Sequence, residues 1–185
     1  MENFFAEALF WLLSALILAL LEIEIEGADG WAAKLPTWRW QPRGIWRWLC
    51  LGHDLTGYWL LSNLFIFFIL HNGFFLGLDW TWDNELKILS RYCLFLPTWD
   101  FLWFVFNPAY GLNNFRRALI PWHAAAPWPF GLMPLDYYSG LSGALFFDWL
   151  RQGYLNQNYY LVYFFILILF IFAAPVYHKI YKKLH

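Results

Sequence analysis

The sequence predicts an all-α, polytopic membrane protein: one helical-bundle domain over residues 1–185, with four transmembrane helices, or five if a short apolar stretch also crosses. Hydrophobic residues make up 61% of the 185 residues and charged residues only 14%, whereas average globular domains have roughly 45–50% and about 25%. Aromatic residues reach 24%, a content typical of chains that meet the lipid interface. Several long apolar runs complete the prediction.

The first two apolar runs cover residues 4–21 and 55–70. The first contains a single acid, Glu7, and is followed by Glu22-Ile23-Glu24. A secretory signal would carry basic residues before the run and small residues after it, so we expect a retained helix. The second run could extend to residue 78, past the break at His71-Asn72-Gly73.

The third run, residues 86–106, is interrupted by Arg91, Pro97 and Asp100, whereas the fourth, residues 159–176, has no charge. Between them, residues 139–150 are apolar but too short to cross a bilayer. Their length predicts a re-entrant or interfacial segment.

Loop charges predict the orientation of these runs. If the first three cross, the loops at 27–54 and 107–138 share one side, and six Lys and Arg residues lie there. The positive-inside rule then places this side in the cytoplasm and the N-terminus outside. The basic tail after His178 also favours the cytoplasm, but four crossings place it outside. This conflict requires a fifth crossing or a misjudged span.

The charge balance limits the partners. With 12 Lys and Arg against 13 Asp and Glu, the chain lacks the basic excess of a nucleic-acid-binding protein. Membrane lipid and a lipophilic small molecule are the expected partners, and a homo-oligomer or a larger membrane complex stays open. Two cysteines provide neither a disulfide framework nor a CxxC metal motif.

Acids and histidines from separate segments form the predicted site at the cytoplasmic face. Glu22 and Glu26 share a helix face, and with Asp100 and His123 they are expected to bind a divalent metal ion: iron, manganese, magnesium or zinc. The alternatives are a solvated acidic rim paired with Arg39, Arg43 or Arg47, and an Asp100 that merely follows Pro97 in the first turn of a helix.

Two further roles complete the predicted site. His53 and Asp100 are the predicted catalytic residues, with His53 as a metal ligand or proton carrier. Arg116 and Arg117 could hold the head group of a substrate, or they could simply anchor the cytoplasmic side. Tryptophan-rich loops at 31–48 and 122–128 are explained by an aromatic belt, or by a groove for a lipophilic molecule.

The function expected from these residues is a metal-dependent membrane enzyme that acts on a lipid or another lipophilic substrate. The alternative is a non-catalytic accessory subunit that packs against partner helices or pigments. A transporter with Asp100 as its ion site is a third class, which only one charged span supports.

Overall fold

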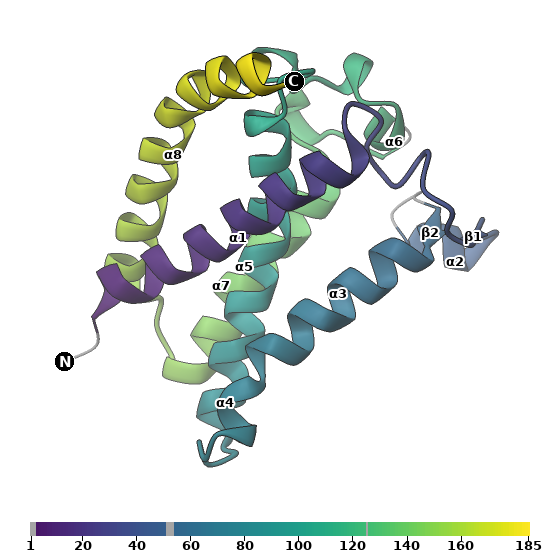
Figure 1. Ribbon diagram of the computed structural model, residues 1–185. Helices are drawn as coiled ribbons and strands as arrows, with labels where there is room; N and C mark the ends of the chain where they lie inside the picture. The colour runs from purple at the N-terminus through teal and green to yellow at the C-terminus, as the bar shows by residue number, and fades with distance from the viewer. Residues whose placement is uncertain (1–2, 51–53, 125) are drawn as a thin grey trace.

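The computed structural model describes residues 3–50, 54–124 and 126–185, and it is 72% helical. The prediction of an all-α fold is therefore confirmed. Five long helices form the body of the molecule (Figure 1): α1 (Phe4–Glu26), α3 (Gly57–Leu70), α5 (Trp82–Phe106), α7 (Leu135–Gln152) and α8 (Gln157–Leu184). The central helix is α5, which packs on α1, α7 and α8.

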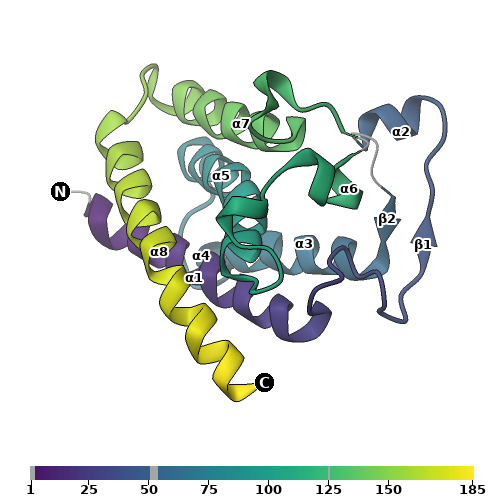
Figure 2. The ribbon, with the colours of Figure 1, turned by 90° about the horizontal axis from the view of Figure 1, so that it is seen from above.

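Short elements join these helices. The helices α2 (Ile45–Leu49), α4 (Asn72–Phe75) and α6 (Pro121–Ala124) are each about a turn long, and η1 (Leu112–Asn114), η2 (Arg117–Leu119) and η3 (Pro129–Gly131) are 3₁₀ turns. The strands β1 (Arg39–Trp40) and β2 (Leu55–Thr56) pair antiparallel, with Arg39 opposite Thr56. Figure 2 shows this small hairpin at the edge of the bundle, beyond the start of α3.

Side-chain caps mark where several helices begin. Thr56, at the N-cap of α3, accepts a hydrogen bond from the backbone N–H of Trp59, and Thr81 does the same for α5 with Asn84. Asn156 caps α8. Each cap satisfies an amide that the helix itself leaves without a partner. At the other end of α7, Gly153 takes the left-handed conformation that glycine favours after a helix.

Two of the helices, α1 and α8, are long and apolar enough to cross a membrane. The second apolar run forms a helix of only 14 residues, and α5 carries several charges. The segment at 139–150 belongs to an 18-residue helix, α7, because the chain turns helical already at Leu135. The structure thus supports two candidate spans, and it does not confirm four or five.

The course of α7 decides at which end of the bundle the C-terminal tail lies. It takes the chain back along α5, so α8 returns to the end of the bundle where α1 and α5 finish. There, His178 Nε2 lies 3.0 Å from the carbonyl oxygen of Val105, and His185 Nε2 lies 3.4 Å from a carboxylate oxygen of Glu24. The tail and the two arginine-bearing loops therefore lie at one end, which we call the cavity end.

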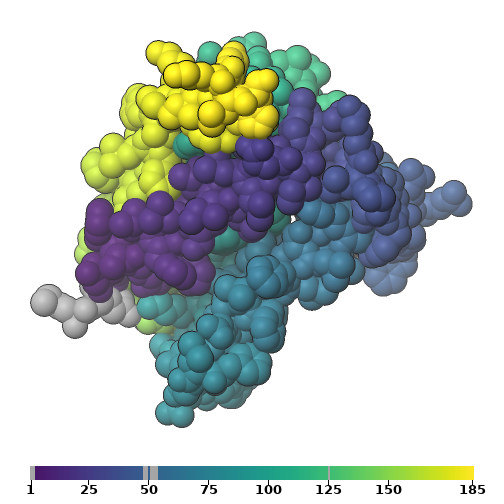
Figure 3. Space-filling view, viewed as in Figure 1, coloured from purple at the N-terminus to yellow at the C-terminus, as the bar shows by residue number. Residues whose placement is uncertain are grey.

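Three of the five buried residues of α1 are alanines, which face the bundle together with Leu12 and Ile23. Ala8, Ala15 and Ala19 are fully buried, which allows a close approach of helix backbones. The outer side of the same helix exposes large apolar residues such as Phe10 and Ile17. In Figure 3, α1 crosses the front of the molecule between α8 and α3, whose outer sides are also apolar. An apolar outer surface of this extent is typical of contact with lipid or partner helices.

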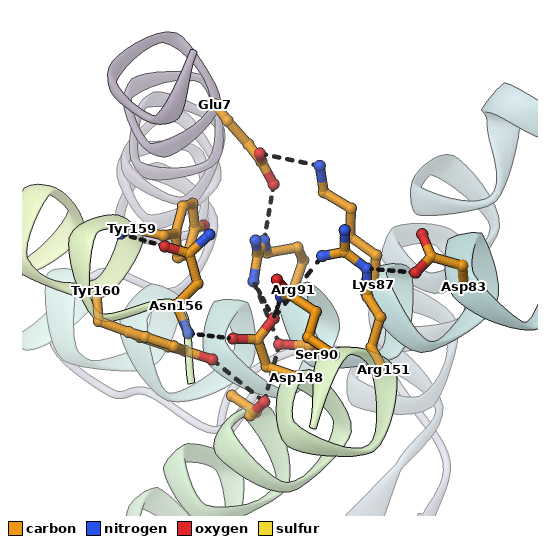
Figure 4. Close-up of polar contacts among 12 residues, drawn as sticks. Glu7, Asp83, Lys87, Ser90, Arg91, Asp148, Arg151, Asn156, Tyr159 and Tyr160 are labelled. Carbon is orange, nitrogen blue, oxygen red and sulfur yellow. Dashed lines mark hydrogen bonds and ion pairs between the residues drawn. The ribbon is translucent and has the colours of Figure 1, made fainter. Parts of the chain in front are cut away.

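A network of charged residues joins the helices at the opposite end (Figure 4). Arg91 of α5 lies 2.8 Å from Glu7 of α1 and stacks its guanidinium 3.6 Å from the ring centre of Tyr159 in α8. Asp148 of α7 is fully buried and accepts a hydrogen bond from the backbone N–H of Asn156. Glu7, Arg91 and Asp148, each a charge within an apolar stretch, thus lie together between four helices.

Candidate functional site

A cavity of about 540 Å³ lies at the cavity end, between α1, α3, α5 and the start of α7. Its wall is rich in aromatic side chains and acids. Among the residues that line it are Glu22, Glu26, Trp31, Tyr58, Trp59, Trp99, Asp100, Trp103, Trp122, His123, Asp136 and Tyr137. The predicted ligands Glu22, Glu26, Asp100 and His123 therefore line one cavity, although they come from three separate segments of the chain.

Asp100 of α5 is held in this wall by two side chains. Its Oδ2 accepts a hydrogen bond from the hydroxyl of Tyr137 at 2.5 Å and lies 3.2 Å from His123 Nε2. Oδ1 accepts no hydrogen bond from the described residues, and a third of the side chain is exposed. One oxygen thus fixes the carboxylate while the group remains accessible from the cavity.

The position of Asp100 within its helix decides between the two predictions for it. Pro97 lies inside α5, which begins fifteen residues earlier at Trp82. Asp100 is therefore no first-turn acid. Gly140 of α7 packs directly against this segment: a Cβ at Gly140 would lie 2.9 Å from the carbonyl oxygen of Cys93 and 3.0 Å from the Pro97 ring.

His123 lies between two carboxylates. It is 1% exposed; its Nε2 faces Asp100, and its Nδ1 lies 3.6 Å from Asp136. Burial lowers the pKa of His123, but the hydrogen bond and charge of Asp100, together with Asp136, outweigh that effect and raise the pKa above its ordinary value. Because both ring nitrogens face acids, His123 is suited to position Asp100 rather than to act on a substrate itself.

Glu22 and Glu26 supply the acidic wall of α1. Glu26 accepts a hydrogen bond from the backbone N–H of Ala32, in a turn where Trp31 and Ala32 have positive φ angles of 48° and 52°. Glu22 is hydrogen-bonded to Tyr58 of α3. Glu24 points away, is half exposed and contacts His185, as the helical spacing predicts.

The donor set does not fit a metal ion. Within residues 3–50, 54–124 and 126–185, no group of three or more His, Cys, Asp or Glu side chains lies close enough together to bind one. The four predicted ligands share a cavity without forming a coordination cluster. The metal therefore stays a prediction that the geometry of the described residues does not support.

The remaining predicted residues have other surroundings. His53 lies outside the described residues. Arg116 and Arg117 are exposed and do not line the cavity, and Arg117 donates to the carbonyl oxygen of Ala124 instead. The 3₁₀ turn η2 places both arginines on the surface, so a substrate bound in the cavity would not contact them. The structure therefore does not support their predicted role in binding a substrate.

The arginines of the first loop do not neutralise the acids of α1. Arg39 donates to the carbonyl oxygen of Ala32, and Arg47 lies 3.5 Å from Asp54. Neither lines the cavity. Arg43 does not line the cavity either, so the described residues do not show an acidic rim paired with Arg39, Arg43 or Arg47.

Sequence reasoning missed Tyr137, the partner of Asp100, and did not single out Asp136, the partner of His123. Both lie in the first turn of α7, a stretch that we expected to be loop. The signal available was Pro134 followed by Leu135-Asp136, since an acid in the first turn is typical of a helix start.

Comparison of the chain with known family models, with curated proteins and with solved structures gives no match.

Proposed function

We propose that this chain is a multi-pass membrane enzyme that acts on a lipid or another lipophilic substrate, with Asp100 as its acid–base group. The observation that supports this most is the geometry of Asp100. A carboxylate is held through Oδ2 by Tyr137 and His123, while Oδ1 is left without a hydrogen bond from the described residues, at the wall of a largely aromatic cavity.

In this proposal Asp100 takes a proton from the polar end of the substrate and returns it to the departing or newly formed group. A general acid or base needs a fixed position within hydrogen-bond reach of the reacting atom. Tyr137 and His123 supply that fixed position and stabilise the carboxylate charge, so they are positioning residues. The aromatic wall excludes water from the reacting group.

The same proposal includes the placement in the membrane. Helices α1 and α8 cross the bilayer, α5 and α7 cross with them, and α3 crosses between α1 and α5 and completes the wall of the cavity. The cavity end faces the cytoplasm because both loops and the tail at that end are basic, and the N-terminus is then non-cytoplasmic. The cavity would lie near the lipid head groups, where a polar group and an acyl chain can both be accommodated.

Turnover of lipids by the purified protein tests this function. The protein in detergent is incubated with a membrane lipid extract, and mass spectrometry records which lipid is consumed and which product forms. Asp100→Asn should lower the rate about 10²-fold or more, as expected for loss of acid–base catalysis. Tyr137→Phe should lower it less, and Glu24→Gln, outside the cavity, should leave it unchanged.

Absence of any lipid turnover, or turnover that does not depend on Asp100, would contradict the proposal. Either result would favour the accessory-subunit function. One observation supports that second candidate: α3 exposes large apolar side chains, including Leu61 at 65% and Phe65 at 62%. Such a helix face is suited to a partner helix as well as to lipid.

A further inference from the structure

We propose that the cavity binds an organic ammonium group, the cationic head of an amphiphile that also carries an oxygen acceptor. This inference rests on the cavity used in the proposed function, and it specifies the chemical class of the substrate. The charge of the wall is the first reason. Four acids line the cavity, Glu22, Glu26, Asp100 and Asp136, whereas no Lys or Arg among the described residues does so.

Glu22 and Glu26, the two acids that α1 contributes to the cavity, have no cationic partner among the described residues. His123 lies between Asp100 and Asp136, Lys34 pairs with Asp29 at 2.9 Å, and the nearby arginines face elsewhere. Glu22 receives hydrogen bonds from Tyr58 and Trp99, and Glu26 receives one from the backbone N–H of Ala32; none of these donors carries a charge. Carboxylates removed from water are costly unless a charge compensates them, and a bound cation would do so.

The aromatic residues of the wall favour an alkylated ammonium over a small inorganic ion. Five tryptophans line the cavity, namely Trp31, Trp59, Trp99, Trp103 and Trp122, and Tyr58 and Tyr137 join them. A cation over the face of an aromatic ring is attracted by about 0.5–2 kcal/mol, and tryptophan is the best partner. A metal ion would instead need several donors at close range, and the described residues do not offer them.

Trp103 points to the second feature of the ligand. It lines the cavity and is 3% exposed, yet its indole N–H has no hydrogen-bond partner among the described residues. A buried donor without a partner costs about 1–3 kcal/mol. A hydroxyl, ether or ester oxygen next to the ammonium group would satisfy it. The cavity volume of about 540 Å³ is ample for such a head group and the first part of a chain.

A pair of probes with the same shape isolates the charge. Choline and its neutral isostere 3,3-dimethylbutan-1-ol differ in having nitrogen or carbon at the branched centre. Calorimetric titration of the purified protein in maltoside micelles should show choline binding about tenfold more tightly or better. Glu22→Gln should weaken choline binding about fivefold or more and leave the isostere unaffected. Glu26→Gln should act in the same direction if Glu22→Gln fails to fold.

Glu24→Gln is the matched control, since Glu24 lies on the same helix but outside the cavity, and it should bind choline as the wild type does. Equal binding of the two probes, no binding of choline, or choline binding that both glutamine variants retain would overturn the inference. So would stoichiometric Mn²⁺ that is lost in Glu22→Gln. Because binding needs no turnover, the two proposals fail separately: choline bound without lipid turnover refutes only the enzyme, and turnover without choline binding refutes only the ammonium site.

Discussion

Replacing Arg91 by methionine should destabilise the protein by about 3 kcal/mol, because it breaks the charged network that joins α1, α5, α7 and α8. Arg91 is 4% exposed and its Nε lies 2.8 Å from Glu7 Oε1. Two unit charges at that distance attract by about 6 kcal/mol at an effective dielectric constant near 20. Desolvation offsets much of this attraction, so deleting one partner of a buried pair costs about 3–5 kcal/mol.

We expect the lower end of that range, because Lys87 remains 3.1 Å from Glu7 and Arg151 remains 3.9 Å from Asp148. Unfolding in mixed micelles with increasing dodecyl sulfate, followed by circular dichroism, measures the change. Asp83→Asn is the control: Asp83 forms an ion pair of 3.0 Å with Arg151, but its side chain is 59% exposed. It should cost no more than about 1 kcal/mol.

A double-mutant cycle separates the pair from other effects of the substitution. Glu7→Gln together with Arg91→Met should be less destabilising than the sum of the single changes by about 1–3 kcal/mol. If the destabilisations of the two single variants simply add, or if the Arg91→Met protein is as stable as the wild type, the claim that this network stabilises the packing of the four helices is refuted.

Two further predictions follow from the cavity end. Gly140→Ala should destabilise the protein by about 1–2 kcal/mol in the same assay, since its Cβ would meet the Cys93 carbonyl and the Pro97 ring. Gly143→Ala should have a smaller effect, because its Cβ would lie 3.1 Å from Cys93 Sγ, a side-chain atom, and would meet no backbone atom. The raised pKa of His123 predicts a stability contribution that is complete below the unfolded-state pKa of about 6.5 and lost as pH rises through the higher folded-state pKa. Thermal unfolding across this range should show the loss in the wild type and not in His123→Gln; an unchanged profile in the variant would contradict it.

The gathering of Glu22, Glu26, Asp100 and His123 could be predicted from the sequence because apolar runs alternate in direction. Glu22 and Glu26 follow the first run, Asp100 lies near the end of the third, and His123 lies in the loop after it. Residues in these three places must lie at the same end of the bundle. Whether they also face one another depends on how each helix is rotated, which composition does not determine. The rotation of α5 is set by Pro97 and Cys93 packing on Gly140 of α7.

Other features depended on contacts that no local pattern shows. Arg116 and Arg117 could be placed at the correct end but not on the correct surface, because the turn η2 orients them.

The network around Arg91, in contrast, left a usable signal in the sequence: Glu7, Arg91 and Asp148 are each a charge within an apolar stretch. Since an unpaired charge there is expensive, their pairing across helices could have been inferred. The additional length of α7, in contrast, reflects packing on α5 rather than hydropathy.

The shared cavity is tested most directly by a cross-link between α1 and α5. In a Cys50→Ser chain with Glu26→Cys, the introduced thiol and the native thiol of Cys93 both face the cavity, so a short flexible bis-maleimide should join them within one molecule. Peptide mass spectrometry should then recover the linked pair, while Glu24→Cys in the same background should give only singly labelled thiols. Equal linkage from both positions, or linkage from neither, would contradict a cavity in which the acids of α1 face Asp100.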